Sequence, residues 1–157
     1  MSAPPSTKAV IVHASCVAIG TQGVLLLGDS GAGKSDLALR LIHEGARLVA
    51  DDRTVLTIKQ KKLHAAAPTT IAGMIEVRGL GIIALPARPA SLALAVQLGR
   101  EGPRLPGEDR WMPALKGAPD LPLLQLDGRH ASDTAKIGMA LRALSKGLFR
   151  DTFVLKS

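Results

Sequence analysis

Eight residues near the start of the chain have the types and the spacing of a phosphate-binding loop. They read GDSGAGKS and satisfy the pattern G-x-x-x-x-G-K-[ST]. Glycines let successive backbone N–H groups turn towards phosphate oxygens, and the N-terminus of a following helix favours negative charge. The pattern therefore predicts a site for a nucleoside triphosphate, with ATP and Mg²⁺ as the cofactors. The residues of this predicted loop are Gly28, Asp29, Ser30, Gly31, Ala32, Gly33, Lys34 and Ser35.

Two residues of the loop have a specific chemical task. Lys34 is expected to neutralise the β- and γ-phosphates, and the hydroxyl of Ser35 is expected to bind Mg²⁺. The structural alternative is a glycine-rich turn followed by a helix that Ser35 caps. The flanking sequence favours the phosphate site, because a strand is expected before the loop and a helix after it.

Two adjacent carboxylates, Asp51 and Asp52, follow a short apolar run. If their strand runs parallel to the one before the loop, both carboxylates face the same crevice. One could orient the metal through water, while the other accepts a proton from an attacking hydroxyl group. A pair of aspartates at a strand end is also an ordinary turn signal. Its position after a phosphate-binding loop favours the catalytic interpretation.

Three further residues are candidates on weaker grounds. A lone histidine in an apolar segment, such as His13, is more often structural than catalytic. Glu76 and Arg78 alternate with apolar residues, so they share one face of a predicted strand. That face could meet solvent, or it could meet the metal and the phosphates. The alternation alone leaves both possibilities open.

The surrounding sequence predicts the elements that position these residues. Apolar spacing from Lys34 to Ile42 predicts a helix of about three turns that Gly45 ends. A second helix is expected at 132–147, and a loop rich in proline, glycine and charge at 99–120. Strands are expected at 9–12, 15–19, 24–27, 47–50, 55–58, 63–67, 75–83 and 121–126, and residues 92–98 are expected to form another strand or a buried segment.

The length and composition favour a single α/β domain. The chain has 157 residues, of which 46% are hydrophobic and only three are aromatic, so its core must be aliphatic. Residues 1–8 are expected to form a flexible N-terminal tail, and residues 9–157 a single P-loop kinase catalytic domain. The single cysteine and the lack of a secretion signal or a long apolar run predict a cytoplasmic protein that does not cross a membrane.

The positive charge does not identify a partner by itself. The formal net charge is +7, but lysines and arginines are spread along the chain. The densest group is Lys59, Lys61 and Lys62, at a predicted hairpin turn without interleaved aromatic residues. A solvated turn is favoured over a nucleic-acid site, so no nucleic-acid partner is expected.

Several blocks together resemble the catalytic domain of the HPr kinase/phosphorylase family, in a short form without the separate N-terminal domain. After His13 the chain carries GDSGAGKSDLAL, RLVADDR and IEVRGLGII in the order and at the spacing of that family. The blocks cover most of residues 10–85. The phosphate-binding loop is widely shared, whereas the ADDR and EVRGLG blocks are distinctive of this family.

The resemblance implies a P-loop kinase fold with a mixed β-sheet, similar to phosphoenolpyruvate carboxykinase, and a homo-oligomer that is commonly a hexamer. It also implies phosphorylation of a serine of the phosphocarrier protein HPr, and in many members the reverse reaction with inorganic phosphate. By resemblance, Asp52 is the proton acceptor and Ser35 and Glu76 are magnesium ligands. His13, Lys34 and Asp51 are their neighbours in the active site.

One part of the family pattern has no match in this chain. Longer members carry an arginine-containing segment near the C-terminal third that supports dephosphorylation, and only the basic loop 102–110 lies in that region. Phosphorylase activity, the particular phosphocarrier, the use of pyrophosphate as donor and the regulating metabolite therefore stay open. A small-molecule kinase and a nucleotide-controlled binding module without turnover are the alternatives.

Overall fold

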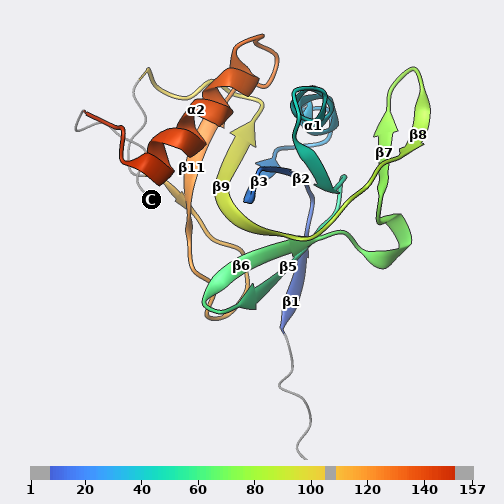
Figure 1. The fold of residues 1–157 in the computed structure, drawn as a ribbon, viewed down its shortest axis with the longest axis horizontal. Coiled ribbons are helices and arrows are strands. Elements are labelled where there is room, and N and C mark those ends of the chain that lie inside the picture. The colour runs from blue at the N-terminus through green and yellow to red at the C-terminus, as the bar shows by residue number, and fades with distance from the viewer. Residues whose placement is uncertain (1–7, 105–108, 151–157) are drawn as a thin grey trace, which may run out of the picture.

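The computed structural model describes residues 8–104 and 109–150, so the expected N-terminal tail lies almost wholly outside the described residues (Figure 1). Within that part of the chain, most strands belong to one mixed sheet in the order β1-β5-β6-β9-β3-β2-β4, and β11 pairs with both β9 and β10. These strands are β1 (Ala9–Val12), β2 (Ala14–Ile19), β3 (Gln22–Leu27), β4 (Arg47–Ala50), β5 (Thr54–Lys59), β6 (Lys62–Ala66), β9 (Ala90–Leu98), β10 (Arg110–Trp111) and β11 (Leu121–Leu126).

The remaining elements are two helices, a short 3₁₀ helix and a separate hairpin. Helix α1 is Lys34–His43, helix α2 is Asp133–Lys146, and the 3₁₀ helix η1 is Thr69–Ile71. The antiparallel strands β7 (Met74–Val77) and β8 (Gly81–Ala84) form a two-stranded sheet that projects from the body beside α1 (Figure 1). The predicted strand at 75–83 is therefore a hairpin.

The strand directions place several loops at one edge of the sheet. Strands β3, β9 and β11 are mutually parallel along the sheet, and β2 is antiparallel to both β3 and β4. Strands β3 and β4 therefore point the same way, with β2 between them. Their carboxyl ends carry the phosphate-binding loop and the aspartate pair, which therefore lie at the same edge.

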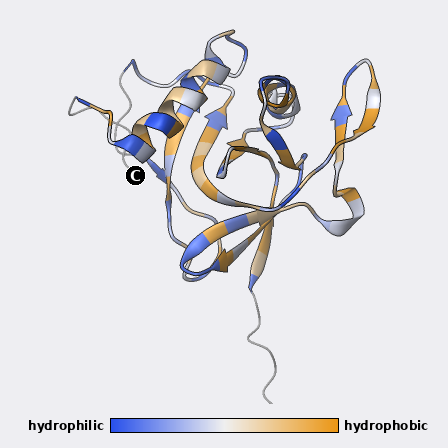
Figure 2. Ribbon diagram, in the orientation of Figure 1, coloured by the Kyte–Doolittle hydropathy of each residue, from blue (hydrophilic) through white to orange (hydrophobic). Residues whose placement is uncertain are grey.

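The core is aliphatic and occupies both faces of the sheet. On one face, Leu26 and Leu94 pack with Leu37 of α1 and Ile137 of α2, so both helices cover this face. On the other face, a second cluster includes Leu56 and residues of β6, because the sheet curls over it (Figure 1). Hydrophilic and hydrophobic segments alternate along α2 in Figure 2, as expected for a helix with one buried face.

The single cysteine belongs to this second cluster. Burial raises the pKa of the Cys16 thiol to about 12, against the opposing effects of a hydrogen bond with the Val24 backbone and the charge of Arg47. The thiol is therefore protonated near neutral pH, and it acts as a small apolar side chain.

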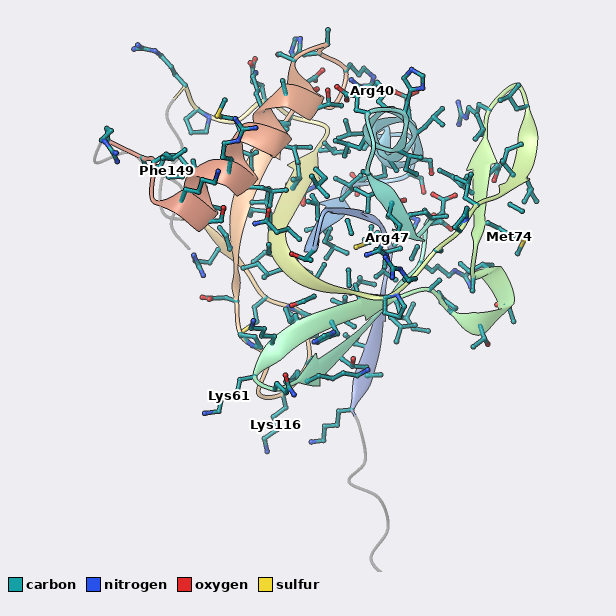
Figure 3. All side chains as sticks on the ribbon, viewed as in Figure 1. Arg40, Arg47, Lys61, Met74, Lys116 and Phe149 are labelled. Atoms are coloured by element: carbon teal, nitrogen blue, oxygen red, sulfur yellow. The ribbon has the colours of Figure 1, made fainter. Side chains whose placement is uncertain are left out.

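The lysine cluster lies at a tight turn, as expected. Gln60 and Lys61 have φ values of 52° and 65°, and positive φ at both central residues is typical of two-residue hairpin turns. The residues from Lys59 to Lys62 are exposed, and Lys61 points away from the body in Figure 3.

Truncation of Leu94 is expected to destabilise the fold strongly. Leu94 is fully buried in β9, and Leu94→Ala should lower the free energy of unfolding by about 2–5 kcal/mol in urea titrations. Leu80 is 75% exposed, so Leu80→Ala should change it by less than about 0.5 kcal/mol. Equal losses in the two variants would contradict the described core.

Candidate phosphate-binding and catalytic site

The phosphate-binding loop follows β3 and leads directly into α1. Gly28, Gly31 and Gly33 have φ values of 151°, 86° and 97°, which L side chains rarely adopt. A Cβ atom at Gly28 would lie 3.0 Å from the Cβ of Ala32, whereas nothing lies within 4 Å of one at Gly31 or Gly33. The loop therefore needs glycine for its backbone shape, and open space adjoins its tip.

Helix α1 begins without a capping side chain. Its N-cap is Gly33, and Ser35 lies inside the helix with its hydroxyl directed to Asp51. Ser35 is therefore not a helix cap, so the capping role in the structural alternative is wrong. Uncapped N–H groups at a helix N-terminus favour an anion, so the loop fits a phosphate group.

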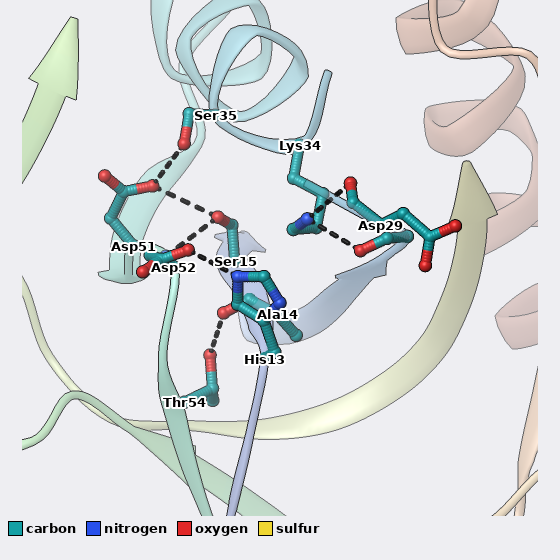
Figure 4. A network of polar contacts seen from close by, with 10 residues as sticks. His13, Ala14, Ser15, Asp29, Lys34, Ser35, Asp51, Asp52 and Thr54 are labelled. Atoms are coloured by element: carbon teal, nitrogen blue, oxygen red, sulfur yellow. Dashed lines mark hydrogen bonds and ion pairs between the residues drawn. The ribbon is translucent and has the colours of Figure 1, made fainter. Parts of the chain in front are cut away.

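Lys34 curls under the loop that precedes it. Its ammonium group donates hydrogen bonds to the carbonyl oxygens of Gly28 at 2.7 Å and Asp29 at 3.0 Å (Figure 4). An ammonium group has three protons, so one more donor is available beyond these two contacts. The side chain is buried, which strengthens its attraction for an anion held by the loop.

Asp51 is the buried centre of the site. Its Oδ1 accepts hydrogen bonds from Ser15 Oγ at 3.1 Å and Ser35 Oγ at 2.7 Å, and its Oδ2 accepts one from the backbone N–H of Glu76 at 3.1 Å. The contacts with Ser15 and Ser35 link the end of β4 to β2 and α1 (Figure 4), and the contact with Glu76 adds the β7–β8 hairpin. Asp51 therefore fixes the hydroxyl group of Ser35 beside the loop.

Asp52 is directed to solvent instead. Its Oδ1 lies 2.7 Å from Nε2 of His13, and the two side chains are 60% and 51% exposed. Its backbone has a φ of 67°, and its N–H donates to Ser15 Oγ at 3.1 Å. An open pocket of about 440 Å³ adjoins this pair, between Ile11 and Arg53. Asp52 is thus the carboxylate that an incoming hydroxyl group can reach.

Ser15 is a site residue that the sequence analysis did not identify. It is fully buried in β2, donates to Asp51 and accepts from Asp52, so it holds both aspartates in place. The available signal was a polar residue at the start of an otherwise apolar run. Its contacts lie 36 and 37 residues away in the sequence, so local spacing could not reveal them.

Loss of the Ser15 hydroxyl group is expected to weaken both the fold and the site. Ser15→Ala leaves the part-buried N–H of Asp52 without its acceptor and removes one of the two hydrogen bonds to Oδ1 of Asp51, which should cost about 1–3 kcal/mol of unfolding free energy. Ser145→Ala is the matched control, because the Ser145 hydroxyl only donates to a carbonyl of its own helix at the surface. Urea titration of both variants checks this, and equal stabilities would contradict the role of Ser15.

Glu76 and Arg78 both have exposed side chains. Glu76 joins the cluster through its backbone N–H, and its side chain is exposed on β7, opposite Ile82 of β8. Arg78 is exposed just beyond β7, on the face for which the alternation left solvent and the metal site both open. The carboxylate that contacts Ser35 is that of Asp51, so Asp51 is the best-placed carboxylate beside the expected metal ligand.

The hydroxyl group of Ser35 and the carboxylate of Asp51 suit Mg²⁺ better than a metal ion that is held by protein ligands alone. Within residues 8–104 and 109–150, no group of three or more His, Cys, Asp or Glu side chains is placed to hold a metal ion. Mg²⁺ is usually held by one or two carboxylates together with substrate phosphates. Ser35 and Asp51, next to the loop, fit this arrangement.

These features define the class of protein: an α/β domain with a phosphate-binding loop and a carboxylate pair at a neighbouring strand end. Residues 6–88, a little more than half of the chain, match the family described as HPr Serine kinase C-terminal domain. The chain belongs to this family, which confirms the family and the fold class predicted from the sequence.

Curated relatives and a solved structure agree with this assignment. The HPr kinase/phosphorylase of Thermoanaerobacter sp. (strain X514) is 47% identical over 75 residues, which are 47% of this chain and 25% of that protein. The HPr kinase/phosphorylase of Clostridium tetani is 46% identical over 82 residues, which are 52% of this chain and 26% of that protein. The matches thus span about a quarter of the length of these relatives.

The structure of the Hpr(Ser) kinase/phosphatase from Coxiella burnetii has the same fold. It superposes with a TM-score of 0.69 and covers 88% of this chain and 97% of that chain, at 24% sequence identity. The shared fold extends beyond residue 88, where the family match ends.

Proposed function

We propose that this chain is an ATP-dependent protein serine kinase that phosphorylates an HPr-type phosphocarrier protein of the phosphotransferase system. The observation that supports this most is that the two aspartates have different burial and different partners. Asp51 is buried and bonded to Ser35, whereas Asp52 is exposed and paired with His13. One carboxylate is thus available for the metal side and the other for an acceptor hydroxyl group.

Each residue has a defined task in this proposal. Lys34 and the loop N–H groups bind the phosphates, and Ser35 with Asp51 holds Mg²⁺. Bound Mg²⁺ neutralises charge on the β- and γ-phosphates. Asp52 accepts the proton of the seryl hydroxyl group, and His13 orients its carboxylate at 2.7 Å. Glu76 and Arg78 lie beside this cluster, where they can support the metal or the phosphates.

The partner and the cellular setting follow from the same assignment. The relatives are named HPr kinase/phosphorylase, and the net charge of +7 suits an acidic protein surface. A homo-oligomer, a hexamer by family resemblance, and a cytoplasmic location belong to this proposal. Among the described residues, no helix is long and apolar enough to cross a membrane.

Consumption of ATP with different acceptors tests the proposed function. The chain is incubated with ATP and Mg²⁺, alone, with an HPr-type carrier, or with a carrier whose acceptor serine is replaced by alanine. We expect transfer only with the intact carrier. Turnover with small molecules alone would indicate a metabolite kinase, and ATP binding without turnover would indicate a binding module.

Addition of excess inorganic phosphate to the phosphorylated carrier tests the reverse reaction. Release of the phosphoryl group would assign phosphorylase activity to this chain. Retention of the group would limit the chain to the kinase direction.

A further inference from the structure

A second loop lies at the same edge of the sheet as the phosphate-binding loop. It comprises Asp127–His130, between β11 and α2, and we call it the β11–α2 loop. Nη2 of Arg129 donates a hydrogen bond to the carbonyl oxygen of Gly31 at 3.0 Å. Arg129 is exposed, so its remaining donors are accessible beside the tip of the phosphate-binding loop.

The β11–α2 loop is fixed to the phosphate-binding loop and its helix. Arg40 of α1 donates to the carbonyl oxygens of Gly128 and His130, on both sides of Arg129. In Figure 3, Arg40 lies on the side of α1 that faces the N-terminal end of α2. A Cβ atom at Gly128 would lie 3.3 Å from the carbonyl oxygen of Ala32, so glycine permits this close approach.

The other end of this loop is also tied down. The N–H of His130 donates to Oδ2 of the buried Asp133 at 2.9 Å, at the start of α2. The N–H of Gly99, after β9, donates to the carbonyl oxygen of Asp127 at 3.2 Å. Arg129 is therefore presented by a constrained backbone.

The strand order places Arg129 and the two aspartates on opposite sides of the phosphate-binding loop. Strands β11 and β9 lie on one side of β3, and β2 and β4 lie on the other. Arg129 comes from the β11 side, whereas Asp51 and Asp52 come from the β4 side. A triphosphate with its terminal phosphate beside Asp52 therefore has its nucleoside end on the side of Arg129.

The exposed groups on that side have suitable chemistry. A guanidinium group is always charged and donates several hydrogen bonds in a plane, which suits phosphate oxygens and the faces of bases. His130 adds a second planar side chain that is 53% exposed. The chain contains only three aromatic residues of the Phe, Trp and Tyr types, so Arg129 and His130 are favoured over an aromatic ring as the planar groups that contact a base.

We propose that the β11–α2 loop is the nucleoside subsite, and that Arg129 binds the α-phosphate and the ribose of the nucleoside triphosphate. The proposal rests on the proposed function, because the terminal phosphate is placed at Asp52. It assigns a role to a segment outside residues 6–88, which match the family. Arg129 is a substrate-positioning residue, and it takes no proton in the reaction.

Binding measurements test the subsite without any phosphocarrier. Calorimetry gives the dissociation constants of ATP and of inorganic pyrophosphate, each with Mg²⁺, for the wild type, Arg129→Gln and Arg142→Gln. We expect Arg129→Gln to weaken ATP about 10–100-fold, since it loses charged hydrogen bonds. Pyrophosphate should bind unchanged, because it can occupy the loop without reaching Arg129. Arg142 is exposed on α2, so Arg142→Gln should bind both ligands as the wild type does.

Arg129→Gln could weaken ATP binding through a lost contact with ATP or through a disturbed phosphate-binding loop. Amide hydrogen exchange of residues 28–35, measured without ligand, distinguishes these two causes. Unchanged exchange in Arg129→Gln, with weaker ATP binding, supports the subsite. Unchanged ATP affinity would overturn it, and so would faster exchange with equal losses for ATP and pyrophosphate. Failure to phosphorylate a carrier would refute the kinase proposal but would leave these binding results interpretable.

Discussion

Replacement of Asp52 by asparagine is expected to lower kcat for transfer to the carrier by about 10²–10⁴-fold. The amide group keeps the size of the side chain and can still contact His13, but it cannot accept the seryl proton. The KM for ATP should change by no more than about twofold, because Asp52 lies on the acceptor side of the phosphates. Steady-state kinetics with varied ATP and varied carrier measure both quantities.

Asp120→Asn is the matched control, because it also replaces an exposed carboxylate by an amide group. Asp120 is exposed before β11, at the opposite end of this strand from the site, and a hydrogen bond from Arg110 lowers its pKa. This variant should retain wild-type kinetics. Near wild-type transfer by Asp52→Asn would show that another group accepts the proton, and a large rise in the KM for ATP would place Asp52 among the nucleotide contacts.

Replacement of Lys34 by alanine is expected to weaken ATP binding by about 10²–10⁴-fold, because a buried positive charge and its remaining hydrogen bond to the phosphates are lost. Transfer to the carrier should fall below detection at ordinary ATP concentrations. Lys34→Arg should not restore it, since the site is buried and holds a compact ammonium group against two loop carbonyls. Calorimetry with ATP and Mg²⁺ gives the affinities.

Two controls separate a lost phosphate contact from a damaged loop. Lys146→Ala removes an exposed lysine near the end of α2 and should bind ATP as the wild type does. Urea titration of Lys34→Ala should show a folded protein, although the carbonyl oxygens of Gly28 and Asp29 each lose the ammonium donor, since that of Asp29 still accepts the N–H of Ala32. Tight ATP binding by folded Lys34→Ala would exclude Lys34 from the phosphate site.

Much of the site could be predicted because its residues are close together in the sequence. The loop at 28–35 is a single continuous pattern, and the strand at 47–50 was predicted with the bounds that β4 has. Of the two aspartates expected to face the loop, Asp51 contacts Ser35, although β2 lies between β3 and β4, whereas Asp52 is directed to solvent and pairs with His13. Strand direction at a sheet edge was enough to bring these parts together.

Contacts between distant segments could not be predicted in this way. Arg129 meets Gly31 over a separation of 98 residues, and Arg40 meets His130 over 90. Neither arginine follows a pattern that distinguishes it from other arginines of this basic chain. The short strand β10, within the expected loop at 99–120, depends on pairing with β11 and has no local signal of its own.

The central claim is that this chain transfers one phosphoryl group from ATP to a serine of an HPr-type carrier, with Asp52 as the proton acceptor. Mass spectrometry of the intact carrier, after incubation with ATP, Mg²⁺ and either wild type or Asp52→Asn, tests it directly. We predict one added phosphoryl group on a seryl residue with the wild type and almost none with the variant in the same time. An unmodified carrier with the wild type, or equal modification by both proteins, would contradict the account.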